Sequence, residues 1–309
     1  MMSAKDDTPP PESAGARISA RFGPALFRGK VLGGRYELES LVGEGSTGLI
    51  VRARDRAENR SVAVKFLRPA LVTDELRLRF DREARAIAVL RSPHVVAVLD
   101  AGADGDLPYM VLEHLEGEDL RQLLKREHRL PVADAVVCMM HVCRALVDAH
   151  ARGIVHRDLK PANLFVTKRD GAPFVKVLDF GVSKILDREV LAPDDEEEVT
   201  RAQTTLGSPR YMAPEQVRSS KDVDARADLW SVGVVLYEML AGAHAFPGPS
   251  ASAAYGVLHD EPVPLVERRA DCPPALAAVV ARCLQKDRER RYRSAAELEA
   301  ALAGAAPRT

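Results

Sequence analysis

The sequence predicts a bilobal α+β fold in which a small, strand-rich lobe with one main helix precedes a larger helical lobe. Short apolar and β-branched segments around glycine turns, such as "RYELESLVGEG" and "SVAVKFL", are concentrated in the first third of the chain. Two long apolar segments with helical end signals follow in the remainder. We expect a flexible leader (residues 1–33), the small lobe (about 34–115), the helical lobe (about 116–303) and a short tail (304–309).

The composition favours a soluble catalyst or binder of proteins. The 309 residues are 46% hydrophobic with a formal net charge of −1, which gives no strong field to attract a polyanion. The leader is rich in Pro, Ser, Gly and Ala without a signal-peptide core, and no apolar run reaches the roughly 18 residues of a membrane span. We therefore expect a cytoplasmic protein with neither nucleic-acid nor membrane partners. Because no Cys-x-x-Cys spacing occurs, we expect buried free thiols at Cys138, Cys143, Cys272 and Cys283.

Ordered structure is expected to begin with two strands on either side of a glycine turn, Tyr36 to Val42 and Leu49 to Ala53. Gly43, Gly45 and Gly48 have the spacing of loops that cradle phosphate groups, which alone is weak evidence because ordinary turns share it. β-branched residues and alternating charges follow Gly48, so a hairpin is favoured over the helix of a dinucleotide-binding fold. Glycines there would let backbone amides approach a triphosphate.

A lysine in the apolar strand "SVAVKFL" needs a partner. Lys65 could extend to solvent, or it could hold phosphate oxygens and be oriented by a carboxylate. Glu83 is the favoured carboxylate and Glu75 the competitor, and both lie in the segment predicted to be the main helix of the small lobe. The apolar residues of that helix recur at helical spacing, at Leu76, Phe80, Ile87 and Leu90.

After a strand and a polar hinge in "PYMVLEHLEGEDL", the chain is predicted to be mainly helical. The segment 131–152 has Pro131 at its start, Gly153 just past its end and an apolar face, which together indicate a long core helix. A second such helix is expected in "ARADLWSVGVVLYEMLAG". Ser294 and Glu297 have the spacing of a capping box before a final helix.

The residues with specific chemistry lie between the two long helices, in "IVHRDLKPANLF" and, after a short hairpin, "VKVLDFGVSK". Asp158 offers a carboxylate for a hydroxyl proton and Lys160 an ammonium for a transferring phosphate. Asn163 and Asp179 offer an amide and a carboxylate for a hard divalent cation. Each also has a structural interpretation: Asp158 could cap a turn, His156 could pack in a core and Asn163 could close the loop. Their joint occurrence, after the glycine loop and the strand lysine, favours catalysis.

With these motifs the chain resembles the eukaryotic-type protein kinase family, in particular its bacterial serine/threonine members. The resemblance runs from about Tyr36 to Ala303 and includes "GEGSTG", "VAVK", "HRDLKPAN", "DFG", "APE" and "DLWSVG". It implies the bilobal kinase fold over residues 34–303, with ATP and Mg²⁺, or Mn²⁺ in its place, in the cleft.

The resemblance also implies a role for each matching position. Asp158 is the catalytic base, and Lys65 pairs with Glu83 and the nucleotide phosphates. Leu112 matches the gatekeeper beside the adenine. Lys160 belongs to the serine/threonine pattern. The implied metal ligands are Asn163 and Asp179. The implied nucleotide site is Val42, Gly43, Glu44, Gly45, Ser46, Thr47, Gly48, Ile50, Ala63, Lys65, Glu83, Glu113, Leu115 and Leu164. The residues that match the stack between the lobes are Ile87, Val98, His156 and Phe180, and those that match a buried ion pair are Glu215 and Arg291.

The segment between Asp179 and Glu215 corresponds to the activation segment and contains the acidic run Asp194 to Glu198. Thr204 matches the usual position of an activating phosphate. Ser208 stands where the family usually has Thr and keeps the hydroxyl. The expected phosphate acceptors, the substrate-loop hydroxyl and the cations that would bind the phosphate are Thr200, Thr204, Thr205, Ser208, Arg157 and Lys184. The acidic run is either a solvated spacer or a weak mimic of the phosphate.

The leading interpretation is a serine/threonine protein kinase that acts on protein substrates, with transient self-association for autophosphorylation in the activation segment. A nucleotide-binding, kinase-like scaffold without turnover is the alternative, although its usual mark, loss of Lys65, Asp158 or Asp179, is missing. A small-molecule phosphotransferase is the third class. It would not need "GSPRYMAPE", whose role in the family is to hold a peptide.

Overall fold

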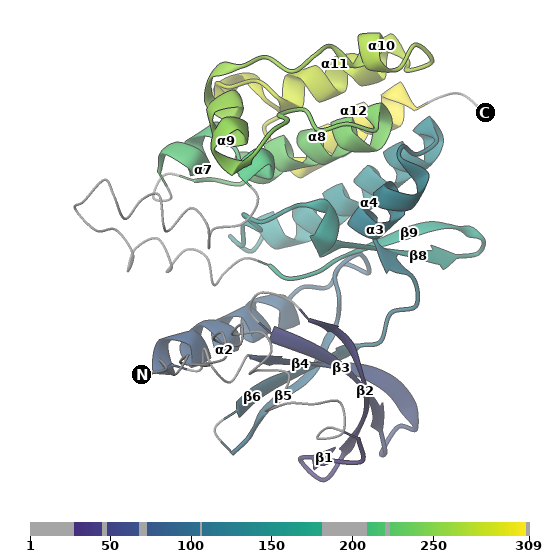
Figure 1. Cartoon of the computed structure of the whole chain (residues 1–309), viewed down its shortest axis with the longest axis vertical. Helices are drawn as coiled ribbons and strands as arrows, with labels where there is room; N and C mark the ends of the chain where they lie inside the picture. The colour runs from purple at the N-terminus through teal and green to yellow at the C-terminus, as the bar shows by residue number, and fades with distance from the viewer. Residues whose placement is uncertain are drawn as a thin grey trace, which may run out of the picture. The chain divides into compact units, whose positions relative to one another are not determined.

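A computed structural model gives the structure of residues 28–44, 48–67, 73–105, 107–180, 209–219 and 223–306. The chain divides into two compact units. The first unit is mainly a β-sheet and the second is mainly helical, which confirms the predicted α+β class (Figure 1).

The first unit is built on a six-stranded sheet with the strand order β1-β2-β3-β4-β6-β5. The strands are β1 (Val31–Leu32), β2 (Tyr36–Glu44), β3 (Gly48–Asp55), β4 (Arg60–Leu67), β5 (Val98–Asp104) and β6 (Leu107–Glu113). Strands β2 and β3 pair antiparallel and confirm the predicted hairpin. The sheet begins earlier than predicted, because Val31 and Leu32, inside the expected leader, pair with β2.

One face of this sheet carries the core of the first unit. Val51, Val64 and Val111 lie opposite one another on neighbouring strands, and each is 0% exposed. The side chains of β3 alternate between buried and more exposed along the strand. Because successive strand residues point to opposite faces, the residues that directly precede and follow each valine in its strand belong to the other face of the sheet.

The second unit contains a small antiparallel sheet and most of the helices. Its strands, in the order β7-β8-β9, are β7 (Glu118–Asp119), β8 (Leu164–Arg169) and β9 (Ala172–Val177). The helix α2 (Asp74–Ala88) begins in the first unit and ends in the second. The other α-helices are α3 (Leu120–Glu127), α4 (Val132–His150), α7 (Pro214–Arg218), α8 (Arg226–Ala241), α9 (Ser250–His259), α10 (Leu265–Arg268), α11 (Pro274–Cys283) and α12 (Ala295–Ala305). The short 3-10 helices are η3 (Pro161–Asn163), η5 (Pro209–Tyr211) and η6 (Arg288–Arg290).

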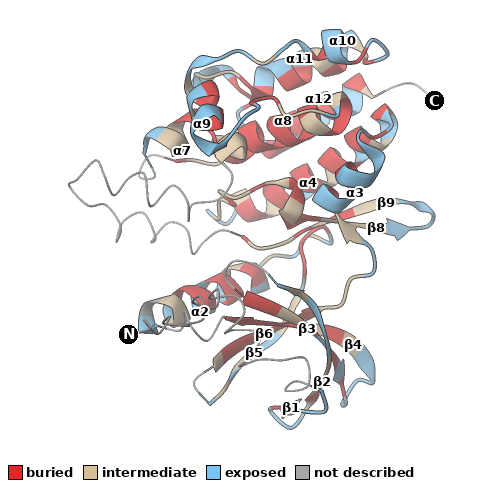
Figure 2. Cartoon of the chain, in the orientation of Figure 1, coloured by how far each residue is buried: buried red, intermediate tan, exposed pale blue. Residues whose placement is uncertain are grey.

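Helix α8 lies at the centre of the second unit. Almost all of its residues are buried, and it packs against α4 and α11 (Figure 2). Trp230 of α8 stacks on Phe246 with ring centroids 5.7 Å apart. A Cβ atom at Gly233 would overlap the Cβ of Cys283 in α11, so glycine lets these two helices approach closely. The four cysteines are free and buried, as predicted.

Both predicted long helices, α4 and α8, are present, and α4 has the predicted end signals. Pro131 directly precedes α4, and Gly153, just past its end, has a φ of 72°. The final helix α12 is also present, but only half of the expected capping box forms. The Oγ of Ser294 accepts the N–H of Glu297 at 3.2 Å, whereas the Glu297 carboxylate accepts the N–H of Arg293. The helix runs to Ala305, two residues past the expected end of the fold.

The division between the units differs from the predicted lobe boundary in one segment. Residues 78–98 were expected in the small lobe, but they pack with the second unit. The reason is that Ile87 and Val95 are buried in the same apolar core as Leu146 of α4. At the hinge the observed division lies between His114 and Leu115, one residue from the prediction.

Candidate active site

The predicted nucleotide-binding residues of the central strands share one face of the sheet in the first unit. Ile50 of β3 lies opposite Lys65 of β4, and Lys65 lies opposite Met110 of β6. Ala63, two residues before Lys65, lies opposite Leu112. By strand alternation these residues lie on the face away from the valine core. This face therefore presents apolar side chains next to the Lys65 ammonium.

The predicted phosphate-binding loop joins β2 to β3. Gly43 lies opposite Ile50, and Val42 beside it is 59% exposed. Glu44 ends β2 and Gly48 begins β3. A Cβ at Gly48 would overlap the backbone oxygen of Phe66, so the close approach of β3 to β4 is itself sufficient to require glycine there. The remaining loop positions, Gly45, Ser46 and Thr47, lie outside the described residues.

Lys65 and Glu83 are both buried, with exposed fractions of 6% and 7%. Buried charges of this kind need a partner, because an isolated charge is unfavourable in a low-dielectric environment. Lys65 belongs to the first unit and Glu83, in α2, to the second. The predicted pairing of these two residues stays a prediction.

The loop before β8 brings together three residues predicted to be catalytic. The Nζ of Lys160 donates to Oδ2 of Asp158 at 2.9 Å. The Nδ2 of Asn163 donates to the same oxygen at 3.1 Å and to the Asp158 backbone oxygen at 2.8 Å. Asn163 is buried, whereas the Asp158 side chain keeps 12% exposure. Two donors thus fix the orientation of a carboxylate that still reaches solvent.

Asn163 also links this loop to the segment that contains Asp179. Its backbone oxygen accepts the N–H of Leu178 at 2.9 Å, which places Asp179 next in the chain. Because the Nδ2 of Asn163 is directed to Asp158, its amide oxygen is the atom left to act as a ligand for a hard cation. Among the described residues, no three His, Cys, Asp or Glu side chains gather as a metal cage. The donor set fits Mg²⁺, which commonly takes one or two protein ligands together with phosphates and water.

His156 is a structural residue of this loop, as its packing interpretation predicted. It is 0% exposed, and its Nδ1 accepts the N–H of Asp158 at 3.2 Å. The Nε2 must therefore carry the proton, which it donates to the Leu178 backbone oxygen at 2.9 Å. The ring packs on Phe180 with centroids 4.7 Å apart. His156 thus ties the loop at Asp158 to the segment at Asp179.

Asp228 positions the same loop and was missed as a site residue in the sequence. It is 0% exposed in α8, and its carboxylate accepts the backbone N–H groups of His156 and Arg157, both at 2.8 Å. The Nε2 of His150 lies 2.8 Å from the same carboxylate. The sequence did contain a signal for this role, because Asp228 is an acidic residue at the start of the otherwise apolar stretch "DLWSVGVVL". A carboxylate buried with such a stretch requires several hydrogen-bond donors.

Gln216 of α7 is a second positioning residue that sequence reasoning missed. Its Nε2 donates to the Arg157 backbone oxygen at 2.9 Å, while its Oε1 accepts the N–H of Ala213 at 3.1 Å. Arg157 has a φ of 62°, an unfavourable region for a residue with a side chain. Asp228 and Gln216 hold both backbone polar groups of Arg157 in that conformation. No local signal in the sequence identifies Gln216.

The phosphate-binding role of Arg157 stays a prediction. Its Nη2 donates to the Val223 backbone oxygen at 3.2 Å, and the side chain is half-buried. The remaining residues of the predicted switch, Thr200, Thr204, Thr205, Ser208 and Lys184, lie outside the described residues.

The ion pair implied by the resemblance is present within the second unit, whereas the stack of Ile87, Val98, His156 and Phe180 stays a prediction. Glu215 accepts two bonds from Arg291, at 2.7 and 2.8 Å, and the Arg291 side chain is fully buried. Ile87 and Phe180 lie in one apolar core, and Val98 packs against it. Leu164, a predicted wall of the adenine pocket, is 0% exposed in this core. Leu115 and Glu113, the predicted hinge residues, are half-buried.

In the described part of the chain, no helix combines the length and the apolar character needed to cross a membrane.

Comparison with known proteins gives a family match over most of the chain. The sequence model of the protein kinase domain matches residues 36–301. The serine/threonine-protein kinase pkn3 of Myxococcus xanthus is 42% identical over 283 residues, which are 89% of this chain and 51% of that protein. The serine/threonine-protein kinase PknB of Mycolicibacterium smegmatis is 40% identical over 277 residues, 88% of this chain and 43% of that protein. A probable serine/threonine-protein kinase of Clostridium perfringens is 38% identical over 272 residues, 87% of this chain and 38% of that protein. This chain spans about half or less of the length of these relatives.

Proposed function

The chain belongs to the protein kinase family, and we propose that it transfers the γ-phosphate of ATP to serine and threonine hydroxyls of proteins. One observation carries the proposal: Lys160 and Asn163 both donate to Oδ2 of Asp158. The backbone of this loop is fixed by two further bonds, from the N–H of His156 to Asp228 and from the N–H of Asp158 to the His156 ring. A carboxylate oriented in this way can accept the proton of a substrate hydroxyl as the hydroxyl attacks phosphorus.

Each residue of the loop has a separate task in this proposal. Asp158 accepts the hydroxyl proton and orients the nucleophile. Lys160, already 2.9 Å from Asp158, places a positive charge where negative charge develops on the transferring phosphoryl group. Asn163 and Asp179 would hold Mg²⁺, with Mn²⁺ as a substitute, and the bound metal supplies neutralisation of phosphate charge.

The sheet of the first unit supports ATP as the phosphoryl donor. Ile50, Ala63 and Leu112 offer an apolar surface for the adenine on the same face as Lys65. Lys65 would bind phosphate oxygens and be oriented by Glu83, and backbone groups of Glu113 and Leu115 would bind the adenine edge.

The activation segment would control the reaction. Phosphate on Thr204 or Thr205, added by another copy during transient self-association, would form charge-assisted bonds with Arg157 and Lys184. Those bonds would order the segment that receives the protein substrate. We place this activity in the cytoplasm.

The proposal is tested with the full-length chain, MgATP and a mixture of short peptides that contain a single Ser, Thr or Tyr. Phosphate should appear on Ser and Thr peptides and not on Tyr peptides, as determined by mass spectrometry. Lys160→Met should lower the rate by about 10² or more because one donor to the transferring group is lost. Lys168→Met, at an exposed position of β8, is the matched control and should leave the rate unchanged. ATP binding by the wild type without any phosphopeptide would instead indicate a scaffold.

A further inference from the structure

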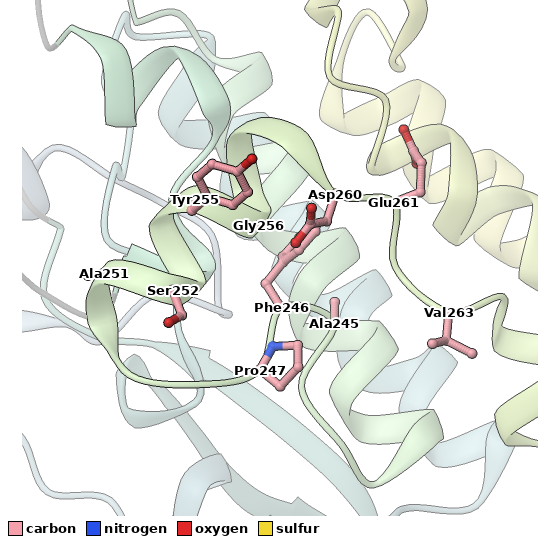
Figure 3. Close-up of a pocket in the computed structure, with 10 residues that line it drawn as sticks. All are labelled: Ala245, Phe246, Pro247, Ala251, Ser252, Tyr255, Gly256, Asp260, Glu261 and Val263. Carbon is pink, nitrogen blue, oxygen red and sulfur yellow. The ribbon is translucent and has the colours of Figure 1, made fainter.

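A cavity beside α9 is separate from the loop at Asp158 and has no task in the reaction proposed above. It has a volume of about 520 Å³ and is lined by the loop before α9, by α9 itself and by the turn that follows (Figure 3). Phe246 and Pro247 contribute apolar surface from the loop, and Val263 contributes it from beyond the helix. A cavity of this size has room for a few side chains of a bound protein segment.

The polar side chains that line this cavity make no hydrogen bond within the described residues. Tyr255 is 62% exposed, and neither its hydroxyl nor that of Ser252 has a partner there. Asp260 and Glu261 are exposed carboxylates that form no ion pair with any residue of the described ranges. The cavity thus combines apolar surface with two negatively charged carboxylates that can accept hydrogen bonds. That combination suits a guanidinium next to a bulky apolar side chain.

Lys286 lies near these carboxylates but is held by α9. Its Nζ donates to the backbone oxygens of Gly256 at 3.2 Å and Val257 at 2.8 Å, near the C-terminal end of the helix. The ammonium also lies 4.4 Å from the ring centroid of Phe246. Burial lowers the pKa of Lys286 to about 8, and the nearby Glu261 and Asp260 oppose that shift. Because this ammonium donates to backbone oxygens, both carboxylates stay available to a cation of a bound partner.

We propose that this cavity docks residues 17–27 of a second copy of the chain, with arginines on Asp260 and Glu261 and apolar side chains in the cavity. This segment, "RISARFGPALF", contains two arginines, each followed by a bulky apolar residue, and no acidic residue. The other long segment outside the described ranges, residues 181–208, contains seven acidic and three basic residues. Its charge opposes docking on two carboxylates.

The choice of a second copy rests on the proposed function, because autophosphorylation between chains requires two copies to meet. The cavity also lies close to the end of the activation segment. The Nη2 of Arg210 in η5 donates to the backbone oxygen of Gly248 at 2.9 Å, and α9 packs against η5 and α7. A leader docked at α9 would hold the second copy beside the residues that receive protein substrates.

The docking site is tested with a fluorescent peptide of residues 15–27 and the full-length chain, without nucleotide. Fluorescence anisotropy should show saturable binding that weakens about tenfold in the double variant Asp260→Asn, Glu261→Gln, because two exposed ion pairs are lost. The control variant Glu116→Gln, Asp134→Asn changes two carboxylates of a separate cavity and should bind like the wild type. No binding by the wild type, or equal binding by all three proteins, would overturn the proposal. Since no phosphate is transferred, these outcomes are independent of the proposed activity.

The identity of the occupant is tested by sedimentation velocity of the full-length chain at several concentrations. A concentration-dependent dimer is expected, and it should dissociate in the double variant Arg17→Gln, Arg21→Gln. A chain that stays monomeric at every concentration would show that docking between copies is wrong. In that case, tighter binding of the labelled peptide by the arginine variant than by the wild type would identify the chain's own leader as the occupant.

Discussion

Replacing Asp228 by Asn should weaken both the stability of the second unit and its chemistry. The Asp228 carboxylate accepts the backbone N–H groups of His156 and Arg157, each at 2.8 Å, and lies 2.8 Å from Nε2 of His150. Asn has nearly the same shape but only one oxygen acceptor. Its NH2 group would face a donor on one side of the site, so at least one buried backbone N–H would lose its partner.

The magnitude follows from these contacts. A buried donor left without a partner costs about 1 to 3 kcal/mol. The bond that remains loses its charge assistance, which is worth about 1 kcal/mol more. We therefore expect a loss of about 2 to 4 kcal/mol in the free energy of unfolding, a large part of the roughly 5 to 15 kcal/mol of a typical domain. Arg157, which Asp228 holds at a φ of 62°, directly precedes Asp158, so kcat should also fall at least about tenfold.

The assay uses urea unfolding followed by the fluorescence of Trp230, the single tryptophan of the chain, which is buried on the same helix as Asp228. Turnover is measured at a temperature where the variant stays folded. Asp224→Asn is the matched control, because Asp224 pairs with Arg226 at the surface and Asn can still accept the Arg226 N–H. A transition midpoint and a kcat equal to those of the wild type would refute the assigned role of Asp228.

Three further predictions follow from particular contacts. Glu215→Gln should lower the free energy of unfolding by about 3 kcal/mol, because the buried guanidinium of Arg291 loses its bidentate partner; a loss under about 1 kcal/mol by urea unfolding would contradict this. Burial and the stacked ring of His94 lower the pKa of His141 to about 4. Since its pKa in the unfolded chain is about 6.5, stability is complete above that pH and should fall by about 1 to 2 kcal/mol between pH 7 and pH 5. His141→Phe should reduce this fall in a comparison of melting temperatures at the two pH values. Asp179→Ala should abolish turnover in MgATP while the variant still binds the Ser and Thr substrate peptides. Retained turnover would exclude a role of Asp179 as a ligand of the metal.

The features that the sequence predicted are those encoded by local patterns. The hairpin of β2 and β3 follows from alternation around a turn, and α4 follows from Pro131, Gly153 and an apolar face between them. The loop with Asp158 and Asn163 was recognisable because several chemical groups occur there in a fixed order within a few residues. Its distances confirm that these groups meet.

The features that the sequence did not predict depend on contacts between distant segments. Strand β1 has two residues and exists because it pairs with β2. Asp228 acts on residues more than 70 positions away, so only the three-dimensional structure identifies the N–H groups that it binds. Likewise, the Glu297 carboxylate could bind the N–H of Ser294 or that of Arg293, and the path of the chain before α12 selects the latter. The burial of Ile87 with the second unit is also a result of packing and not of helical spacing.

The proposed role of Asp158 is that of base and positioning group for phosphoryl transfer to protein hydroxyls. It is tested most directly by Asp158→Asn, with incorporation of phosphate from MgATP into Ser and Thr peptides and nucleotide binding measured on the same preparation. The rate should fall by about 10² to 10⁴ while the dissociation constant for ATP changes little, because Asp158 acts in the transition state. An Asp158→Asn variant that phosphorylates the peptides at the wild-type rate would show that Asp158 does not have this role.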